Sequence, residues 1–210
     1  MKLRPLVVRV LLFLGLFALP CCAQNFSADV VYLAGTSPSP SSNATPLHPT
    51  SKLYVNKDDL RLETHGLNGT VLLVNVEDQI AVAMFPSRKS YAVLTSPPSE
   101  YFSVANPEDA CADWQQASSR KISCKKVGSE AVSGRPAVKY QNADAAPSEV
   151  SAIWIDSALK YVIKWEGAQT GAELQNIKEG QQAADLFKVP RDFNPVEPRK
   201  GTKGFSKAKP

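Results

Sequence analysis

Residues 127–165 limit the fold of this chain more than any other stretch, because short apolar runs alternate there with turn residues. A Ser-Gly pair at 133–134, an Asn/Asp/Pro loop and a polar segment at 156–160 stand where the runs stop. Turn residues between runs of this length are typical of β-hairpins. In the last run, one face is apolar and aromatic: Tyr161, Ile163 and Trp165 alternate with Val162, Lys164 and Glu166. This period of two predicts an antiparallel sheet with one buried face.

Tightly spaced apolar runs also fill the region before this stretch. We expect strands at Phe26–Ala34, Lys52–Asn56, Leu60–Thr64, Val71–Val76, Gln79–Phe85 and Ser90–Thr95. The later breaks between them are short and polar, which favours an up-and-down meander, since parallel connections need a dozen or more residues. Residues 71–76 and 79–85 are apolar on both faces. These strands must be covered on both sides or line a hydrophobic interior on one.

Helix signals are confined to a few places. Asn106 as an N-cap, with Pro107 in the first turn, predicts a short helix over Pro107–Ala117 laid against the sheet. An irregular loop held by a disulfide is the alternative there. Residues 172–178 fit a strand or part of a helix equally well. Residues 183–187 predict a brief helical turn, and Val189-Pro190 is expected to end regular structure.

The start of the chain predicts an export signal. Basic residues precede a short apolar run, Val10–Leu19, and small residues follow at 21–23. This order is typical of a secretory signal peptide at 1–23, and the run is too short for a spanning helix of about 20 residues. A retained membrane anchor, or a lipoprotein acylated at Cys21 or Cys22, is the alternative. We expect a protein of the periplasm or cell envelope, with no transmembrane span after signal removal.

The net positive charge of the chain comes largely from the predicted signal peptide. Three of the 24 basic residues precede position 24, which leaves 21 basic against 20 acidic residues. A single β domain is predicted over 24–196, followed by a basic tail at 197–210 that we expect to be disordered. Nucleic-acid binding would require a basic patch with interleaved aromatics, and Phe205 stands alone in the tail.

Two cysteines remain after the signal, Cys111 and Cys124. An even pair in an exported protein most often forms a disulfide, and closing so short a loop contributes about 3 kcal/mol. A zinc site is the alternative, but it requires further ligands, and neither His48 nor His65 is near in sequence.

No motif for catalysis or cofactor binding is visible. The sequence lacks a nucleophile elbow, a phosphate-binding glycine loop and a dinucleotide fingerprint. Its acidic pairs, such as Asp58-Asp59 and Glu108-Asp109, fall in turns or at the helix start, where turn chemistry explains them. We therefore predict no enzyme, no metal site and no cofactor.

Large apolar residues on the expected strands are the candidates for a ligand cavity. Stiff aromatic walls suit a lipid or another apolar ligand, although such residues more often form a core. The candidate lining residues are Leu73, Val82, Met84, Trp154, Tyr161, Ile163 and Trp165.

Three phrases carry a family resemblance: VSGRPAVKYQ at Val132–Gln141, AIWIDSALKYVIKWE at Ala152–Glu166 and LFKVPRDFNPV at Leu186–Val196. Together with the signal and the short strands, they resemble the LolA/LolB-like lipoprotein-carrier superfamily, and within it poorly characterised LolA-like (DUF4412-like) exported bacterial proteins. The resemblance implies an incomplete antiparallel β-barrel, mainly β, with short helices covering its concave face. In carrier members that face shelters lipoprotein acyl chains.

Two functions follow as hypotheses. The first is an envelope protein that binds a lipid-like or acylated ligand, as a carrier would. The second is a non-catalytic structural or interaction module of the cell envelope, whose core is filled by its own side chains and whose surface meets a protein partner.

Overall fold

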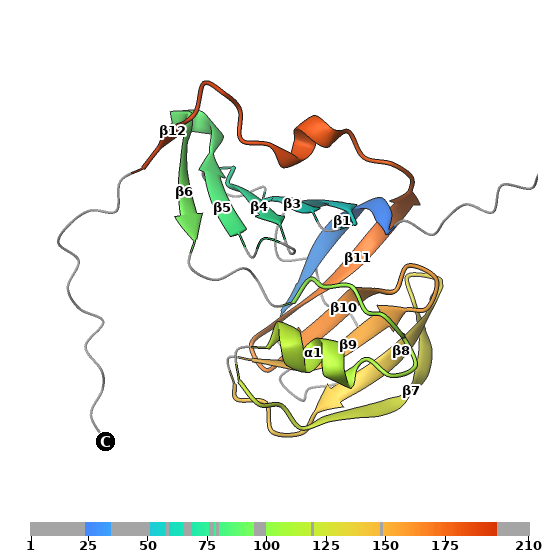
Figure 1. Cartoon of the computed structure of the whole chain (residues 1–210). Coiled ribbons are helices and arrows are strands. Elements are labelled where there is room, and N and C mark those ends of the chain that lie inside the picture. The colour runs from blue at the N-terminus through green and yellow to red at the C-terminus, as the bar shows by residue number, and fades with distance from the viewer. Residues whose placement is uncertain are drawn as a thin grey trace, which may run out of the picture.

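The computed structural model describes residues 24–34, 51–57, 59–64, 69–75, 78, 80–94, 100–118, 120–147 and 149–196 (Figure 1). The predicted signal peptide at 1–23, with Cys21 and Cys22, and the basic tail at 197–210 lie outside these residues. The division into signal, domain and tail therefore stays a prediction.

The described strands form one sheet in the order β12-β6-β5-β4-β3-β2-β1-β11-β10-β9-β8-β7. Neighbours are antiparallel, except that β12 runs parallel to β6. The strands are β1 (Asn25–Ala34), β2 (Ser51–Asn56), β3 (Asp59–Glu63), β4 (Val71–Asn75), β5 (Ile80–Phe85), β6 (Ser90–Leu94), β7 (Cys124–Val132), β8 (Arg135–Asn142), β9 (Val150–Asp156), β10 (Tyr161–Gly167), β11 (Thr170–Glu179) and β12 (Asn194–Pro195). The helical elements are α1 (Cys111–Ala117) and the 3-10 turns η1 (Pro86–Arg88) and η2 (Ala184–Phe187).

Two meanders account for this order. Strands β1 to β6 follow one another across one half of the sheet, and β7 to β11 follow one another across the other. The long strand β11 returns to β1 and joins the halves, with Val30 opposite Leu174 and Ala34 opposite Thr170. The sheet ends at β7 on one side and at β6 and β12 on the other, without closing. The predicted fold class, a mainly β, incomplete antiparallel barrel, is confirmed.

The main core gathers buried side chains from β1 to β5 and from β7 to β11. The helix α1 packs against the concave face of the second group (Figure 1). Alternate residues supply it in β1, where Phe26, Ala28 and Val30 are buried and their neighbours are partly exposed, whereas β9 contributes four consecutive residues, 152–155. Each large apolar side chain buried in this way contributes roughly 1.5–3 kcal/mol relative to exposure. Trp114 of α1 joins the same core, which fixes the helix over β7 to β10.

The predicted helix is present but shorter than expected. The sequence predicts Asn106 as its cap, yet α1 begins at Cys111 with Ala110 as its N-cap. The Asn106 side chain instead accepts the Glu108 N–H at 3.0 Å, and its carbonyl accepts the Asp109 N–H at 3.0 Å. These bonds close a separate turn before the helix, because an Asn side chain competes for nearby backbone groups.

Two predictions near the C-terminus are decided by tertiary pairing. The ambiguous segment 172–178 is part of β11, because its partner β1 satisfies the backbone groups along its length. The prediction that regular structure ends at Val189-Pro190 is wrong, because the short strand β12 follows. Residues beyond it cross the outside of the sheet, and β12 then pairs with β6, with Asn194 opposite Ser90.

A bulge breaks the alternation predicted along β10. The register shifts between Val162 and Lys164, so Tyr161, Val162 and Ile163 are all buried. The turn between β7 and β8 is as expected, because Ser133 and Gly134 adopt φ of 47° and 77°. Two successive positive φ values match the turns that join tight hairpins, which favour glycine.

Candidate functional site

The predicted lining residues fall into two separate clusters. Leu73, Val82 and Met84 lie on the outside of β4 and β5, in what we call the outer cluster. The remaining four, Trp154, Tyr161, Ile163 and Trp165, belong to the main core. No single surface of the described residues brings all seven together.

The outer cluster is covered by the C-terminal segment. Val189 and Phe193 pack against Val71, Leu73 and Met84. Before that contact, the Arg61 guanidinium donates a hydrogen bond to the Leu186 carbonyl at 2.8 Å, which holds η2 against β3. These residues therefore form a second, smaller core that the chain closes with its own end.

Trp154 lies on the opposite face from its neighbour Ile153. Its ring is clamped between two ammonium groups, since Lys139 Nζ and Lys164 Nζ lie 4.3 and 4.4 Å from the ring centroid. Both lysines stand directly across from it on β8 and β10. The indole N–H donates to Glu130 on β7. A cation on each side of the ring explains a buried tryptophan on a charged face.

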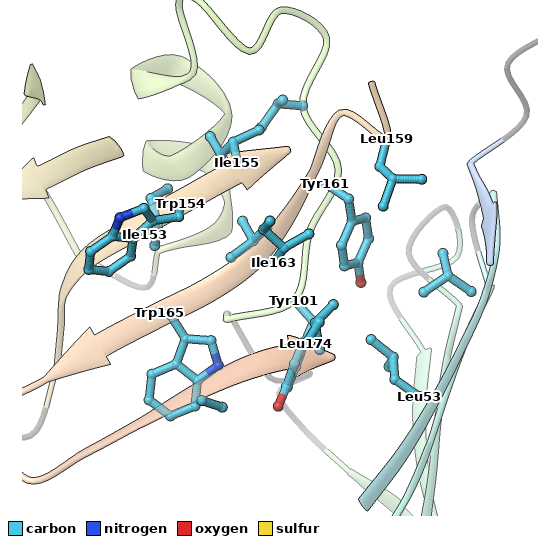
Figure 2. Packing of buried hydrophobic residues seen from close by; sticks show 14 of the residues in the cluster. Leu53, Tyr101, Ile153, Trp154, Ile155, Leu159, Tyr161, Ile163, Trp165 and Leu174 are labelled. Carbon is cyan, nitrogen blue, oxygen red and sulfur yellow. The ribbon is translucent and has the colours of Figure 1, made fainter. Parts of the chain in front are cut away.

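On the concave face, Trp165 meets a residue that sequence reasoning missed, Tyr101 (Figure 2). The Tyr101 hydroxyl and the Trp165 indole N–H are both buried and have no hydrogen-bond partner among the described residues. Burial, with a further contribution from nearby Tyr32, holds the pKa of Tyr101 well above its usual value. An unpaired buried polar group costs about 1–3 kcal/mol. The two groups are near enough to interact, because the Trp165 side chain partly offsets the raised pKa of Tyr101.

Tyr101 reaches this position because its segment continues the sheet. At its first residues β10 lacks β11 as a partner, and residues 102–104 take that place. The Val104 N–H donates to the Lys160 carbonyl at 2.8 Å, and the Val162 N–H donates to the Phe102 carbonyl at 3.2 Å. Nothing in the sequence signals this short addition, since residues 100–104 lack strand length and alternation.

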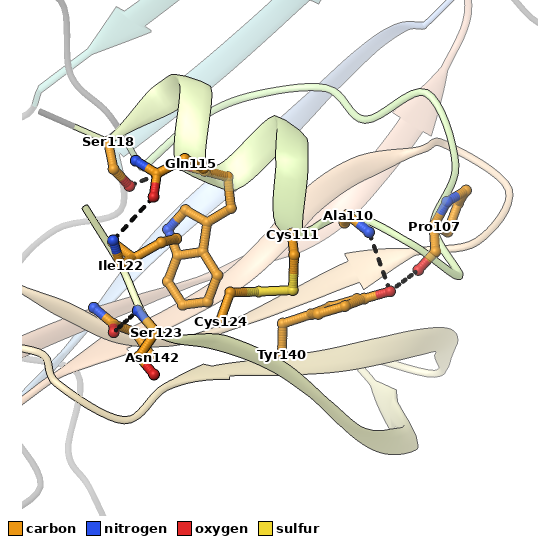
Figure 3. The surroundings of a disulfide bond; sticks show 11 residues. Pro107, Ala110, Cys111, Gln115, Ser118, Ile122, Ser123, Cys124, Tyr140 and Asn142 are labelled. Carbon is orange, nitrogen blue, oxygen red and sulfur yellow. Dashed lines mark hydrogen bonds between the residues drawn. A yellow bond between two sulfur atoms is a disulfide. The ribbon is translucent and has the colours of Figure 1, made fainter. Parts of the chain in front are cut away.

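The helix that follows is fastened to the sheet by the disulfide between Cys111 and Cys124, which confirms the predicted pair (Figure 3). Tyr140 adds a second attachment, because its hydroxyl accepts the Ala110 N–H at 3.2 Å and donates to the Pro107 carbonyl at 3.0 Å. The Gln115 side chain accepts the Ile122 N–H at 3.0 Å. A disulfide fits a protein that folds in an oxidising compartment, as an exported protein does.

The buried carboxylate of Asp156, at the end of β9, has a structural role. Asp156 accepts the N–H groups of Ala158 and Leu159 at 2.7 and 2.8 Å, and Arg135 binds its other oxygen. Both of its oxygens therefore serve the β9–β10 turn and β8. Across the described ranges, no group of three His, Cys, Asp or Glu side chains is placed to hold a metal ion. In the same ranges, no helix has the length and apolar character needed to cross a membrane.

Comparison with known proteins yields fold likeness only. No family model and no curated protein sequence matches the chain. Among solved structures, an uncharacterised conserved protein from Thermus thermophilus is 11% identical with a TM-score of 0.48, covering 82% of this chain and 89% of that one. The MucA/MucB complex of Pseudomonas aeruginosa gives 13% identity and a TM-score of 0.44, covering 80% of this chain and 56% of the matched chain.

PNGF-II gives a TM-score of 0.50 at 10% identity, and the match covers 82% of this chain but only 31% of PNGF-II. At this identity the likeness concerns the fold alone. It says nothing of activity.

Proposed function

We propose that this protein is an exported, non-catalytic binding protein of the cell envelope that engages a protein partner through the outside of a filled half-barrel. The filled concave face is the observation that carries the proposal. Ile163, Leu174 and Trp165 are buried there beneath Tyr101, and Trp114 covers the adjoining part. A face that its own side chains occupy offers no ready surface to a ligand, so binding falls to the outer surface and the sheet edges.

Secretion and the absence of catalysis are parts of the same proposal. The disulfide supports export, because such bonds persist in oxidising compartments. The buried acid, Asp156, is held by an arginine and two backbone N–H groups, which supports a role in folding rather than proton transfer. A structural or interaction module of the envelope is the class that these features favour.

The test is a titration of the mature protein with palmitate and with an apolar fluorescent probe, followed by tryptophan emission and calorimetry. We expect no saturable binding at sub-millimolar ligand. A Leu174→Ala variant provides the positive control, because truncating this buried side chain leaves a cavity that the probe can enter. Saturable binding of palmitate to the unaltered protein would overturn the proposal.

A LolA-like carrier of acyl chains is the second candidate, and the buried Tyr101 hydroxyl and Trp165 N–H, which lack a partner among the described residues, favour it. Both groups can donate to the carbonyl or carboxylate oxygen of an acylated ligand. For such a ligand to reach them, the segment carrying Tyr101 must lift from β10. If the carrier function holds, palmitate binds, Trp165 emission changes and Tyr101→Phe weakens binding at least tenfold.

A further inference from the structure

The exposed apolar side chains of this protein gather at one edge of the sheet. The described residues expose five large hydrophobic side chains, and four of them lie at or beside β6. These are Ile80, Val93, Leu94 and Val196, exposed by 49%, 67%, 37% and 47%. The fifth is Val127 on β7, at the other edge. Scattered exposed apolar residues need no explanation, whereas a gathered set marks an interaction surface.

The backbone at this edge is open where these side chains lie. β12 pairs with β6 only at Ser90 and Tyr91. Within the part of the chain that the structure describes, nothing pairs with the outer side of Ala92–Leu94. The Asn194 N–H donates to the Lys89 carbonyl at 2.9 Å and the Val196 N–H to the Tyr91 carbonyl at 2.7 Å. By this period of two, the next outward N–H and C=O belong to Val93.

The chain's own continuation is poorly suited to extend this ladder. Following the same spacing, the donor to the Val93 carbonyl would be residue 198. That residue is Pro198, which has no N–H to donate. The intramolecular strand β12 therefore shows that this edge accepts an added strand, and a proline at position 198 cannot donate the next bond of the ladder.

A second copy of this chain is also a poor occupant. Only three residues of β6 are free, because β12 occupies the rest of the edge. Two such edges paired with each other bury far less than the roughly 1,200 Å² of a stable interface. An extended segment of another protein is less restricted, since it can follow β6 and also cover the apolar side chains on both faces.

The register shows which chemistry the occupant needs. Val93 stands opposite Val82, and Leu94 stands opposite Ala81 on the other face. Ile80 adjoins the first pair, and Val196 follows Pro195, which stands opposite Tyr91. A partner strand would therefore meet apolar side chains on both faces, and none of these described residues carries a charge that would select an opposite one.

We propose that the free edge of β6 at Ala92–Leu94 is a docking site for an extended, apolar segment of a protein partner, which adds to the sheet as a further strand. This inference rests on the proposed function and names its site. Main-chain hydrogen bonds to Val93 supply the pairing. Successive apolar residues of the partner point to opposite faces, so that one covers Val93 and the next covers Leu94.

The experiment selects binders from a phage library of random dodecapeptides against the whole mature protein, then synthesises the enriched peptides. We expect successive β-branched or leucine residues, because both faces at this edge are apolar, and no proline in the paired stretch. Binding should weaken at least tenfold in Val93→Lys and stay within twofold in Val127→Lys, the matched change on the other edge. N-methylation should abolish binding at one position of the peptide and not at the residues on either side of it, because the free stretch of β6 offers a single outward carbonyl, that of Val93.

Several results would overturn the proposal. These are no enrichment, peptides that tolerate Val93→Lys, insensitivity to N-methylation, or a concentration-dependent dimer that Val93→Lys abolishes. The last result assigns the edge to a second copy. Enriched peptides that bind elsewhere on the outside leave the proposed function standing while this site fails. Palmitate binding at the concave face removes the proposed function whatever the peptides do.

Discussion

The two edges of the sheet, β7 and β6, differ in how they are protected from pairing with another chain. At β7 the register shifts at Val127, which places a bulge in the strand. Lys125, Lys126 and Glu130 are exposed around it. Bulges and charged side chains are the devices that keep an edge strand from pairing with another chain. At β6, the free residues Ala92–Leu94 have neither a bulge nor a charge.

Exposure alone therefore does not mark a binding surface. Val127 is 51% exposed, yet its neighbours discourage a partner, since Lys126 pairs with Glu108 and Glu130 binds Trp154. Val93 is 67% exposed, and none of the described residues beside it on β6 protects it in this way. Because natural proteins usually protect their edges, an unprotected one is better explained by a partner that covers it. The β7 edge is protected, and the β6 edge is left available.

The largest effect on stability should come from the disulfide beside the protected edge strand, β7. Replacing both Cys111 and Cys124 by serine should lower the free energy of unfolding by about 3 kcal/mol, because the unfolded chain regains the entropy of a short loop. Urea unfolding of the parent and the double variant measures it. Peptide binding at β6 should be unchanged in the folded variant. A loss below about 1 kcal/mol, far short of the loop-entropy expectation, would contradict the view that β7 depends on this fastening.

Two buried tyrosines provide the next effect and its matched control. Tyr140→Phe leaves the Ala110 N–H and the Pro107 carbonyl unpaired, so it should cost about 1–3 kcal/mol. Tyr101→Phe removes a hydroxyl that has no partner among the described residues, and it should cost nothing or stabilise slightly. Thermal and urea unfolding compare the two. Equal losses would indicate that the Tyr101 hydroxyl is bonded after all.

Alkaline pH tests the same tyrosines. Burial raises the pKa values of Tyr101 and Tyr140 above 10.0 in the folded protein, whereas the unfolded side chains titrate at the ordinary value. Protons are then bound more tightly by the folded state. The stabilisation is complete below the unfolded pKa and is lost as pH rises past about 10. Unfolding curves measured from about pH 8 to about pH 11 should show this fall, and Tyr101→Phe should make it shallower.

A smaller effect is expected at the turn that leads out of β7. Gly134→Ala should cost about 1–2 kcal/mol, because Gly134 has φ of +77° and a side chain there strains the backbone. None of the described atoms lies within 4 Å of the added Cβ, so the cost is conformational. Gly128→Ala is the control, since that position is equally open and its φ is not in the left-handed region. Denaturation midpoints that agree for both variants would contradict this account of the turn.

Much of the fold can be predicted from local sequence signals. The exceptions depend on contacts between residues far apart in the sequence or on a side chain with more than one possible use. Alternation and short turns place β1 to β6 within one or two residues, because each run is long enough to set its period. β12 escapes prediction because two residues carry no period, and the strand is positioned through Val189 and Phe193, which pack on the outer cluster. The predicted helix start is displaced because Asn106 has two possible uses, and sequence cannot choose between them.

The candidate site is harder to predict for a related reason. Alternation assigns residues to faces but does not say which face is open. It indicates a buried face for Leu73 and Met84, but not that the covering element is the chain's own C-terminal segment. Alternation also makes Trp154 and Trp165 look alike, although only the first has two lysines across from it. Tyr101 lies in a segment without any period.

The smallest effect on stability belongs to the two edge substitutions themselves. Val93→Lys and Val127→Lys should each change the free energy of unfolding by no more than about 0.5 kcal/mol, because both side chains are exposed. Urea unfolding of the two variants checks this. A larger loss in Val93→Lys would mean that Val93 is packed in the folded protein, and the edge would then not be open.

Amide hydrogen exchange at Val93 tests the central claim most directly. In the free mature protein, NMR should show rapid exchange of the Val93 amide, while the amides of the neighbouring strand β5 stay protected. Adding a selected peptide should slow Val93 exchange at least tenfold and leave the amides of β7 unchanged. A Val93 amide that is already protected in the free protein, or peptide-induced protection that appears on β7 instead, would contradict an open β6 edge.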